Sequence, residues 1–263
     1  MRTIVSKDGT NIAFDQIGSG PTVILVAGAI QHRAFDQETA YLADLLAPYF
    51  NVINYDRRGR GESGDTQPYA PARELEDIEA LIDDGGGAAY LYGMSSGAAL
   101  AMEAAEALGG KVKKLAMYEA PFHDDPEARQ RWQEYRQELN ALLAAGRRGD
   151  AMAVFMRLAG TPPEHLAQVQ QSPAWPIFVG VAPTLAYDAA ILGEESAVPC
   201  EQAARLRIPA LVMAGEASPP FMRTTAAALA GAIPGGRYKV LPGQTHAVKA
   251  EALAPALIDF FCE

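Results

Sequence analysis

The pentapeptide Gly93-Met94-Ser95-Ser96-Gly97 is the stretch of sequence that decides the fold. It directly follows residues 88–92, which have the apolar pattern of a buried strand, and it runs into residues 96–108, which have a helical pattern. A G-x-S-x-G sequence at a strand-to-helix junction indicates a strained turn that exposes a serine hydroxyl at the edge of a sheet, with the glycines leaving room for neighbouring backbone. Ser95 is therefore the candidate nucleophile.

Alternating strands and helices surround this junction. Residues 22–27 form a short, continuous apolar run rich in β-branched side chains, which is typical of a strand buried on both faces of a parallel sheet. Residues 2–5 and 11–17 fit an opening antiparallel hairpin. Further strands are predicted at residues 51–55, 113–118, 208–214 and 238–241, and helices at residues 36–46, 72–82, 221–232 and 248–261. This alternation predicts an α/β fold with a doubly wound, mostly parallel sheet.

The alternation stops after the predicted strand at residues 113–118 and resumes with the strand at residues 208–214. Residues 122–204 have a helical pattern, and Thr161-Pro162-Pro163-Glu164 predicts a helix start with a capping box. We therefore predict one core domain made of residues 1–121 and 205–263, interrupted by a helical cap at residues 122–204. If its entry and exit loops emerge at the carboxyl ends of the strands, such an insert lies over those ends, where open α/β sheets bind ligands.

A serine hydroxyl is a poor nucleophile at neutral pH and needs a base within hydrogen-bond reach. His246 is the candidate base, because it lies between the last predicted strand and the last predicted helix, at the same edge of the sheet as Ser95. The other three histidines, His32, His123 and His165, are interpreted as bystanders.

Taken in order along the chain, these motifs resemble the α/β-hydrolase superfamily. The set comprises Ala27-Gly28 after a strand, the turn Asp56-Arg57-Arg58-Gly59-Arg60-Gly61-Glu62-Ser63, the serine junction and the late histidine. The turn is structural in such hydrolases. The resemblance implies an oxyanion hole made of two backbone N–H groups, those of Ala29 and Ser96. Here Ala27 stands where the family often has histidine.

The carboxylate that orients the histidine departs from the family's usual pattern. Its usual position corresponds to Ser218, which carries no negative charge. Glu119, after the strand that follows the serine helix, resembles the alternative acid position of some haloalkane dehalogenases and is favoured here. Glu216 is a second alternative, and a weakened dyad of serine and histidine, supported by Ser218 or water, is a third.

The chemistry expected of these residues is acyl transfer, because serine naturally forms an acyl-enzyme. We predict hydrolysis of a carboxylic ester, thioester or lactone of a small to medium apolar substrate. The apolar segment at residues 173–179 is a candidate roof for the pocket. Two alternatives stay open: cofactor-free perhydrolase-like or lyase activity on the same fold, and a non-catalytic ligand-binding receptor.

Composition narrows the possible partners. The 263 residues carry a formal net charge of −10, which disfavours nucleic acid and anionic membrane surfaces. No metal-ligand spacing or phosphate-binding loop occurs, so no cofactor is expected. The first residues lack the apolar core of a signal peptide. Cys200 and Cys262 lie far apart and form no C-x-x-C motif, so we interpret them as free thiols in a reducing compartment. We therefore expect a cytoplasmic monomer or homodimer that acts on a small molecule.

Overall fold

A computed structural model describes residues 1–263 and contains one eight-stranded sheet in the order β1-β2-β4-β3-β5-β6-β7-β8. The first two strands pair antiparallel, β2 pairs antiparallel with β4, and every other pair is parallel. The predicted doubly wound, mostly parallel sheet is therefore confirmed. The strands are β1 (Arg2–Val5), β2 (Asn11–Gly18), β3 (Thr22–Val26), β4 (Asn51–Tyr55), β5 (Ala89–Met94), β6 (Val112–Tyr118), β7 (Ala210–Gly215) and β8 (Arg237–Leu241).

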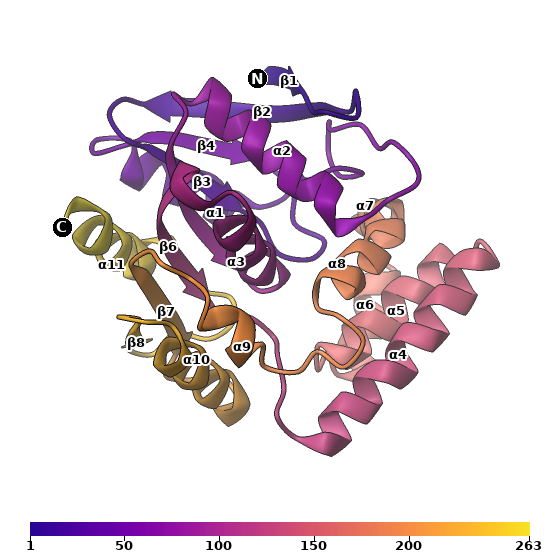
Figure 1. Ribbon diagram of the computed structural model, residues 1–263. Coiled ribbons are helices and arrows are strands. Elements are labelled where there is room, and N and C mark those ends of the chain that lie inside the picture. Colours follow the sequence, from indigo (N-terminus) through magenta and orange to yellow (C-terminus); the bar gives the residue numbers. More distant parts are fainter.

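Helices cover both faces of the sheet, as Figure 1 shows. Those connecting the strands are α1 (Gln37–Leu46), α2 (Pro71–Asp84), α3 (Ser96–Ala107), the short 3-10 helix η1 (Gly109–Lys111), α10 (Pro220–Ala232) and α11 (Ala250–Cys262). Helices α1 and α11 pack together in one apolar cluster, whereas α2, α3 and α10 belong to the other. The sheet is therefore buried on both faces.

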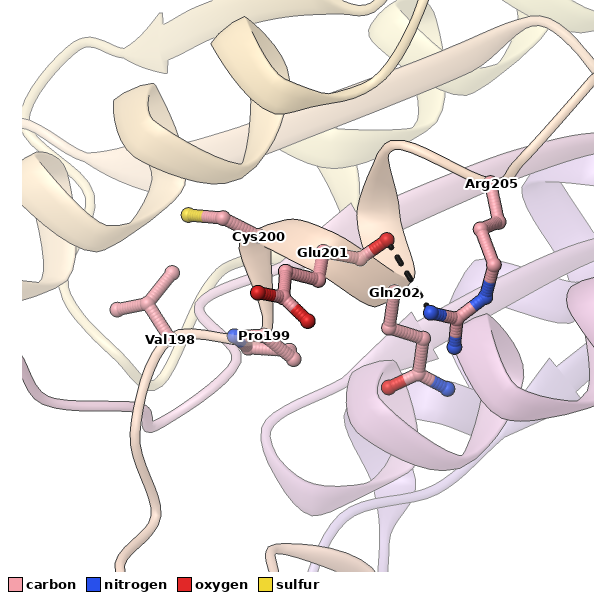
Figure 2. A pocket seen from close by; sticks show the side chains of 6 residues that line it. All are labelled: Val198, Pro199, Cys200, Glu201, Gln202 and Arg205. Carbon is pink, nitrogen blue, oxygen red and sulfur yellow. Dashed lines mark hydrogen bonds between the residues drawn. The ribbon is translucent and has the colours of Figure 1, made fainter.

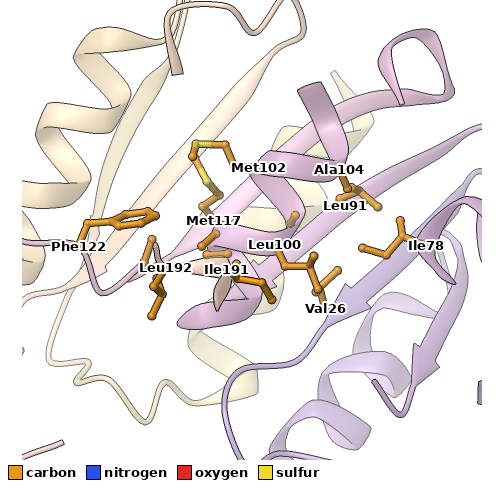
Figure 3. Close-up of a cluster of buried hydrophobic side chains, with 14 of the residues drawn as sticks. Val26, Ile78, Leu91, Leu100, Met102, Ala104, Met117, Phe122, Ile191 and Leu192 are labelled. Atoms are coloured by element: carbon orange, nitrogen blue, oxygen red, sulfur yellow. The ribbon is translucent and has the colours of Figure 1, made fainter. Parts of the chain in front are cut away.

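The central strand β3 explains why the sheet needs helices on both sides. Its residues are all buried, with Val23 and Leu25 in the cluster that contains α1 and α11. Ile24 and Val26 point the other way, into the larger cluster of 48 residues that contains α3. Successive side chains of a strand point to opposite faces, so a continuous apolar run must be covered twice. Figure 3 shows part of the larger cluster, with Val26 among its members.

The chain between β6 and β7 is helical. It forms α4 (Pro126–Ala144), α5 (Arg148–Leu158), α6 (Pro163–Gln170), α7 (Trp175–Val181), the 3-10 helix η2 (Ala182–Thr184), α8 (Leu185–Ile191) and α9 (Cys200–Ala203). Helices α4, α5 and α6 gather beside the sheet in Figure 1, and α8 contacts both α3 and α4. Helix α9 packs on α10, beside the sheet. The division into a core domain and a cap at residues 122–204 stays a prediction.

Two local features of these helices bear on the sequence reading. Thr161 does not cap α6, because the helix begins at Pro163 and its N-cap residue is Pro162, which makes no side-chain hydrogen bond. The predicted capping box is therefore wrong. By length and composition, none of the helices would cross a membrane alone; α6 together with Trp175–Ile191 would qualify only as a pair that is bent by 97°.

Candidate active site

Ser95 lies at the strained turn between β5 and α3. Its backbone has φ 55° and ψ −129°, a left-handed conformation that is rare for a residue with a side chain. The flanking glycines permit the close approach that this turn needs. A Cβ on Gly93 would lie 2.3 Å from the carbonyl oxygen of Gly97, and one on Gly97 would lie 2.2 Å from that of Val26. Larger residues at either position would push the turn away from the sheet.

Glu119 occupies the corresponding point at the end of the neighbouring strand β6. The N–H of Ser95 donates to the carbonyl of Tyr118, 2.9 Å away, so the two strand ends are tied together next to Glu119. Glu119 also has a positive φ, 50°, and is fully buried. Its N–H donates to the Met213 carbonyl at 3.0 Å, and its Oε1 accepts from the N–H of Gly215 at 2.7 Å. The carboxylate is therefore anchored to β7.

The second oxygen of this carboxylate contacts the candidate base. Glu119 Oε2 lies 2.8 Å from His246 Nδ1. Burial raises the pKa of the Glu119 carboxyl, but hydrogen bonds, with that to His246 the largest, hold the pKa below its ordinary value. The hydroxyl of Tyr118 donates to the carbonyl of Thr245 at 2.6 Å, which fixes the loop just before the histidine. A carboxylate bonded to Nδ1 leaves Nε2 as the ring nitrogen available for proton transfer.

The other two acid alternatives lie differently. Ser218 is buried near Glu119 and Tyr118, but its hydroxyl has no hydrogen-bond partner. Glu216 accepts a hydrogen bond from the N–H of Gly243 at 2.9 Å, in an exposed position. Glu119 is therefore the carboxylate that the fold brings to His246.

The nucleophile and the base share an edge of the sheet without a hydrogen bond between them. The hydrogen-bond partner of the His246 ring is Glu119, and the ring is 41% exposed. Ser95 is half-buried. Tyr118 links the two residues, because its carbonyl binds the Ser95 N–H and its hydroxyl binds the residue before His246. The hydrogen bond between a catalytic serine and its histidine is often long in enzymes without substrate, and it shortens when substrate binds.

The loop after β3 supplies the second candidate oxyanion donor. A Cβ on Gly28 would lie 3.0 Å from the Cβ of Ser95, so this loop passes directly beside the nucleophile. The N–H of Ala29 donates to no backbone carbonyl. Ser96 is the first residue of α3, and a first-turn N–H has no partner within its helix. The two N–H groups are thus free to bind an anion.

Three buried residues near this loop were not assigned a site role from the sequence. Arg57 and Arg60 belong to the turn after β4, and Asp188 belongs to α8. Both arginines form ion pairs with Asp188, at 2.8 and 2.7 Å. The sequence did contain a signal for the arginines, since three of them, Arg57, Arg58 and Arg60, occur within eight residues. Asp188 had none, because one acid in a helical segment is ordinary.

Other concave features lie away from these residues. A surface pocket of about 410 Å³, shown in Figure 2, is lined by the segment around α9 and by Arg205, with none of the predicted site residues. A second cavity of about 260 Å³ lies between α3 and the end of α8, with Met102, Phe122, Ile191 and Leu192 among its lining residues. No group of three or more His, Cys, Asp or Glu side chains is arranged to hold a metal ion.

The chain matches a known protein family and several proteins of known structure. The model of the alpha/beta hydrolase family matches residues 23–256. The chain belongs to this family. An alpha/beta hydrolase from Sphaerobacter thermophilus, known from its crystal structure, is 49% identical with a TM-score of 0.87, and the match covers 99% of this chain and 100% of that one. The enol-lactonase from Burkholderia xenovorans has the same fold at 22% identity, with a TM-score of 0.69 over 100% of both chains.

Curated relatives of this alpha/beta hydrolase match over shorter stretches. The probable oxidoreductase EphD of Mycobacterium tuberculosis is 36% identical over 89 residues, which is 32% of this chain and 14% of that protein. The present chain therefore aligns with a small part of that relative's length. The roles of Ser95, His246, Glu119, Ala29 and Ser96 stay predictions, and they form the basis of the function proposed below.

Proposed function

We propose that this alpha/beta hydrolase is a serine hydrolase that cleaves a carboxylic ester, thioester or lactone through an acyl-enzyme on Ser95. The observation that carries the proposal is the buried Glu119 carboxylate bonded to His246 Nδ1, at the sheet edge where Ser95 lies in its strained turn. A carboxylate at this position holds the imidazole in the tautomer that can accept a proton at Nε2, and it stabilises the imidazolium that results.

The first half of the reaction forms the acyl-enzyme. Ser95 Oγ attacks the carbonyl carbon while His246 Nε2 takes the hydroxyl proton, and the carbonyl π electrons move onto oxygen. The N–H groups of Ala29 and Ser96 bind that oxyanion. When the tetrahedral intermediate collapses, the bond to the leaving alcohol, thiol or ring oxygen breaks, and the leaving group takes the proton from His246.

The second half returns the free enzyme. Water attacks the acyl carbon as His246 takes its proton, the same two N–H groups bind the second oxyanion, and the carboxylic acid leaves as Ser95 Oγ is protonated again. Glu119 stays ionised throughout, which its lowered pKa favours. The residues named here supply every proton transfer of this cycle.

The proposed substrate is a small to medium apolar molecule. Phe178 of α7 packs edge-on against Phe35 in the segment that follows β3, with ring centres 5.0 Å apart, so an aromatic pair joins the helical segment to the loop that carries Ala29. Apolar and aromatic walls favour an acyl group of that character.

The test is labelling and turnover. A serine-directed sulfonyl fluoride should label Ser95, as read by peptide mapping, and a short-chain p-nitrophenyl ester should give a burst of one p-nitrophenol per enzyme. Ser95→Ala should abolish the burst and lower turnover by several orders of magnitude, on the order of 10⁴ or more. Label on another residue, or turnover that survives in Ser95→Ala, would contradict the proposal. Product analysis separates hydrolysis from perhydrolysis or lyase chemistry.

A further inference from the structure

A buried ionic cluster lies directly beneath the proposed oxyanion hole. The carboxylate of Asp188 accepts hydrogen bonds from Ser96 Oγ at 2.7 Å, from Arg57 Nη1 at 2.8 Å and from Arg60 Nη2 at 2.7 Å. Arg57, Arg60 and Asp188 are at most 4% exposed. Charges this deeply buried are kept only when they are paired and hydrogen-bonded, so the cluster holds its members in one arrangement.

The same arginines donate hydrogen bonds to the loop that carries Ala29. Arg60 Nη1 donates to the carbonyl of Gly28 at 2.6 Å, and Arg57 Nη1 donates to that of Ala27 at 3.2 Å. The Gly28 carbonyl and the Ala29 N–H belong to one planar trans peptide group, in which they point in opposite directions. A donor that fixes the carbonyl on one side therefore aims the N–H on the other. It also polarises the group, which makes that N–H a stronger donor.

The second proposed donor is connected to the same carboxylate. The Ser96 hydroxyl donates a hydrogen bond to Asp188. The side chain of Ser96 therefore fixes the position of the residue whose N–H is the second proposed donor. Burial raises the pKa of Asp188, but Arg60 and Arg57 hold that pKa below its ordinary value, so Asp188 accepts hydrogen bonds as a carboxylate. Asp188 is thus connected to both proposed oxyanion donors, directly to Ser96 and through Arg60 to the peptide group of Ala29.

We propose that Asp188, acting through Arg60 and Ser96, is the positioning residue of the oxyanion hole. Asp188 lies on α8, between β6 and β7. The packing of this helical segment on the sheet therefore determines the direction in which the N–H groups of Ala29 and Ser96 point. The inference rests on the proposed function, since it concerns the same reaction. Asp188 itself touches no reacting atom; its effect is transmitted through one peptide plane and one hydroxyl.

The chain contains a matched control in the same turn. Arg58 is as deeply buried as Arg57, and it forms a two-point ion pair with Asp77, at 2.8 and 2.7 Å. Its further partners are Asp8 and the carbonyl of Arg73. None of these groups belongs to the oxyanion loop. Asp77→Asn therefore breaks a buried ion pair of the same kind without touching the proposed hole.

The experiment compares Asp188→Asn with Asp77→Asn in the full chain. For each, we would measure kcat and KM on a p-nitrophenyl ester, the melting temperature, and the Ki of an aryl trifluoromethyl ketone, which forms an oxyanion on the nucleophilic serine. Removing one oxyanion donor costs about 10² to 10³ in kcat, and loss of aim should cost about 10 to 10². We expect that loss in kcat for Asp188→Asn, with KM within about threefold and Ki raised by the same factor as kcat/KM falls.

The control should lose stability to a similar extent while keeping kcat and Ki within about threefold of the unsubstituted chain. Arg60→Lys keeps the positive charge but replaces the two nitrogens that bond Gly28 and Asp188 by a single one, so it should give an intermediate kcat. Ser96→Ala removes one hydroxyl and leaves the N–H in place, so it provides the same test at a cost of about three- to tenfold if Asp188→Asn does not fold.

Equal losses in Asp188→Asn and Asp77→Asn, or a loss confined to KM, or an unchanged ketone Ki, would overturn the positioning role. The same holds for a silent Ser96→Ala when Asp188→Asn does not fold. Failure of the proposed function gives a different result. In that case the unsubstituted chain neither turns over the ester nor binds the ketone, or does so equally well as Ser95→Ala.

Discussion

At the scale of single residues, backbone strain marks the candidate site. The non-glycine residues with positive φ are Ile30, Ser95, Glu119 and Ser196. The first three follow β3, β5 and β6, whose carboxyl ends meet at one edge of the sheet. Strained conformations persist only where the surrounding structure enforces them, and they cluster where a side chain has to be aimed. Here the strain aims the candidate nucleophile and acid from adjacent strands.

The acid assignment gives the prediction at this scale. Glu119→Gln keeps the size of the side chain but removes the charge that orients His246 and stabilises its protonated form. We expect kcat on a p-nitrophenyl ester to fall by about 10² to 10⁴ with little change in KM.

Glu216→Gln is the matched control, because the Glu216 carboxylate accepts a hydrogen bond only from the exposed N–H of Gly243. It should stay within about threefold of the unsubstituted chain, as surface substitutions usually have small effects. An unchanged kcat in Glu119→Gln together with a large loss of kcat in Glu216→Gln would show that Glu216, and not Glu119, is the acid.

At the scale of elements, the junction of β5 with α3 depends on glycine for space. Gly97 lies so close to β3 that a Cβ would meet two backbone oxygens, those of Val26 and Ala27, at 2.2 and 2.5 Å. Backbone cannot rotate out of the way as a side chain can. Helix α3 would have to move as a unit and carry Ser95 with it.

We therefore expect Gly97→Ala to lower the free energy of unfolding by about 3 kcal/mol, at the upper end of the overpacking range, and to abolish labelling of Ser95. Chemical denaturation and sulfonyl fluoride labelling measure the two effects. Gly231→Ala in α10 is the control, because a Cβ there meets nothing within 4 Å. It should raise the unfolding free energy by about 0.5 to 1 kcal/mol, since alanine favours helix more than glycine does. A tolerated Gly97→Ala would show that the junction is not sterically closed.

The start of α6 shows the limit of reading elements from sequence. Thr161 and Glu164 have the spacing of a capping box, yet the helix begins one residue too late for Thr161 to cap it. Pro163 is favoured in the first turn because its ring fixes φ and its missing N–H needs no partner. The two adjacent prolines thus determine the start of the helix without a side-chain cap.

At the scale of the whole molecule, packing of the helical segment on the sheet buries charge. Glu103 of α3 lines the cavity between α3 and α8. Burial, with repulsion from Glu74 and Glu106, raises the pKa of Glu103 from 4.5 to about 7. Between those pH values the folded chain binds more protons at this site than the unfolded chain. Stability is therefore lost as pH rises from 4.5 to 7, and the loss is complete above pH 7.

Glu103→Gln should remove this loss. We expect it to raise the unfolding free energy at pH 8 by about 1 kcal/mol, less than the full shift implies because the side chain is partly exposed to solvent, and to have little effect at pH 4. Thermal unfolding at the two pH values measures the difference. Glu106→Gln on the same helix should give no net gain at pH 8, because losing the ion pair with Arg205, which lowers the pKa of Glu106, offsets the relief of its repulsion with Glu103. A gain for Glu103→Gln that is equal at both pH values would contradict the burial argument.

The sequence by itself determined the sheet, the strained serine turn and the edge at which His246 lies. These follow from local rules: apolar periodicity, the steric need for glycine, and the fact that parallel strands end on one side. It left the acid open among Glu119, Glu216 and neither, because that choice depends on the direction in which each side chain leaves its strand end. Asp188 and Ser96 are 92 residues apart, so only the packing of α8 against α3 brings them into contact. Contacts between distant parts of a chain are set by how elements pack, which no local pattern encodes.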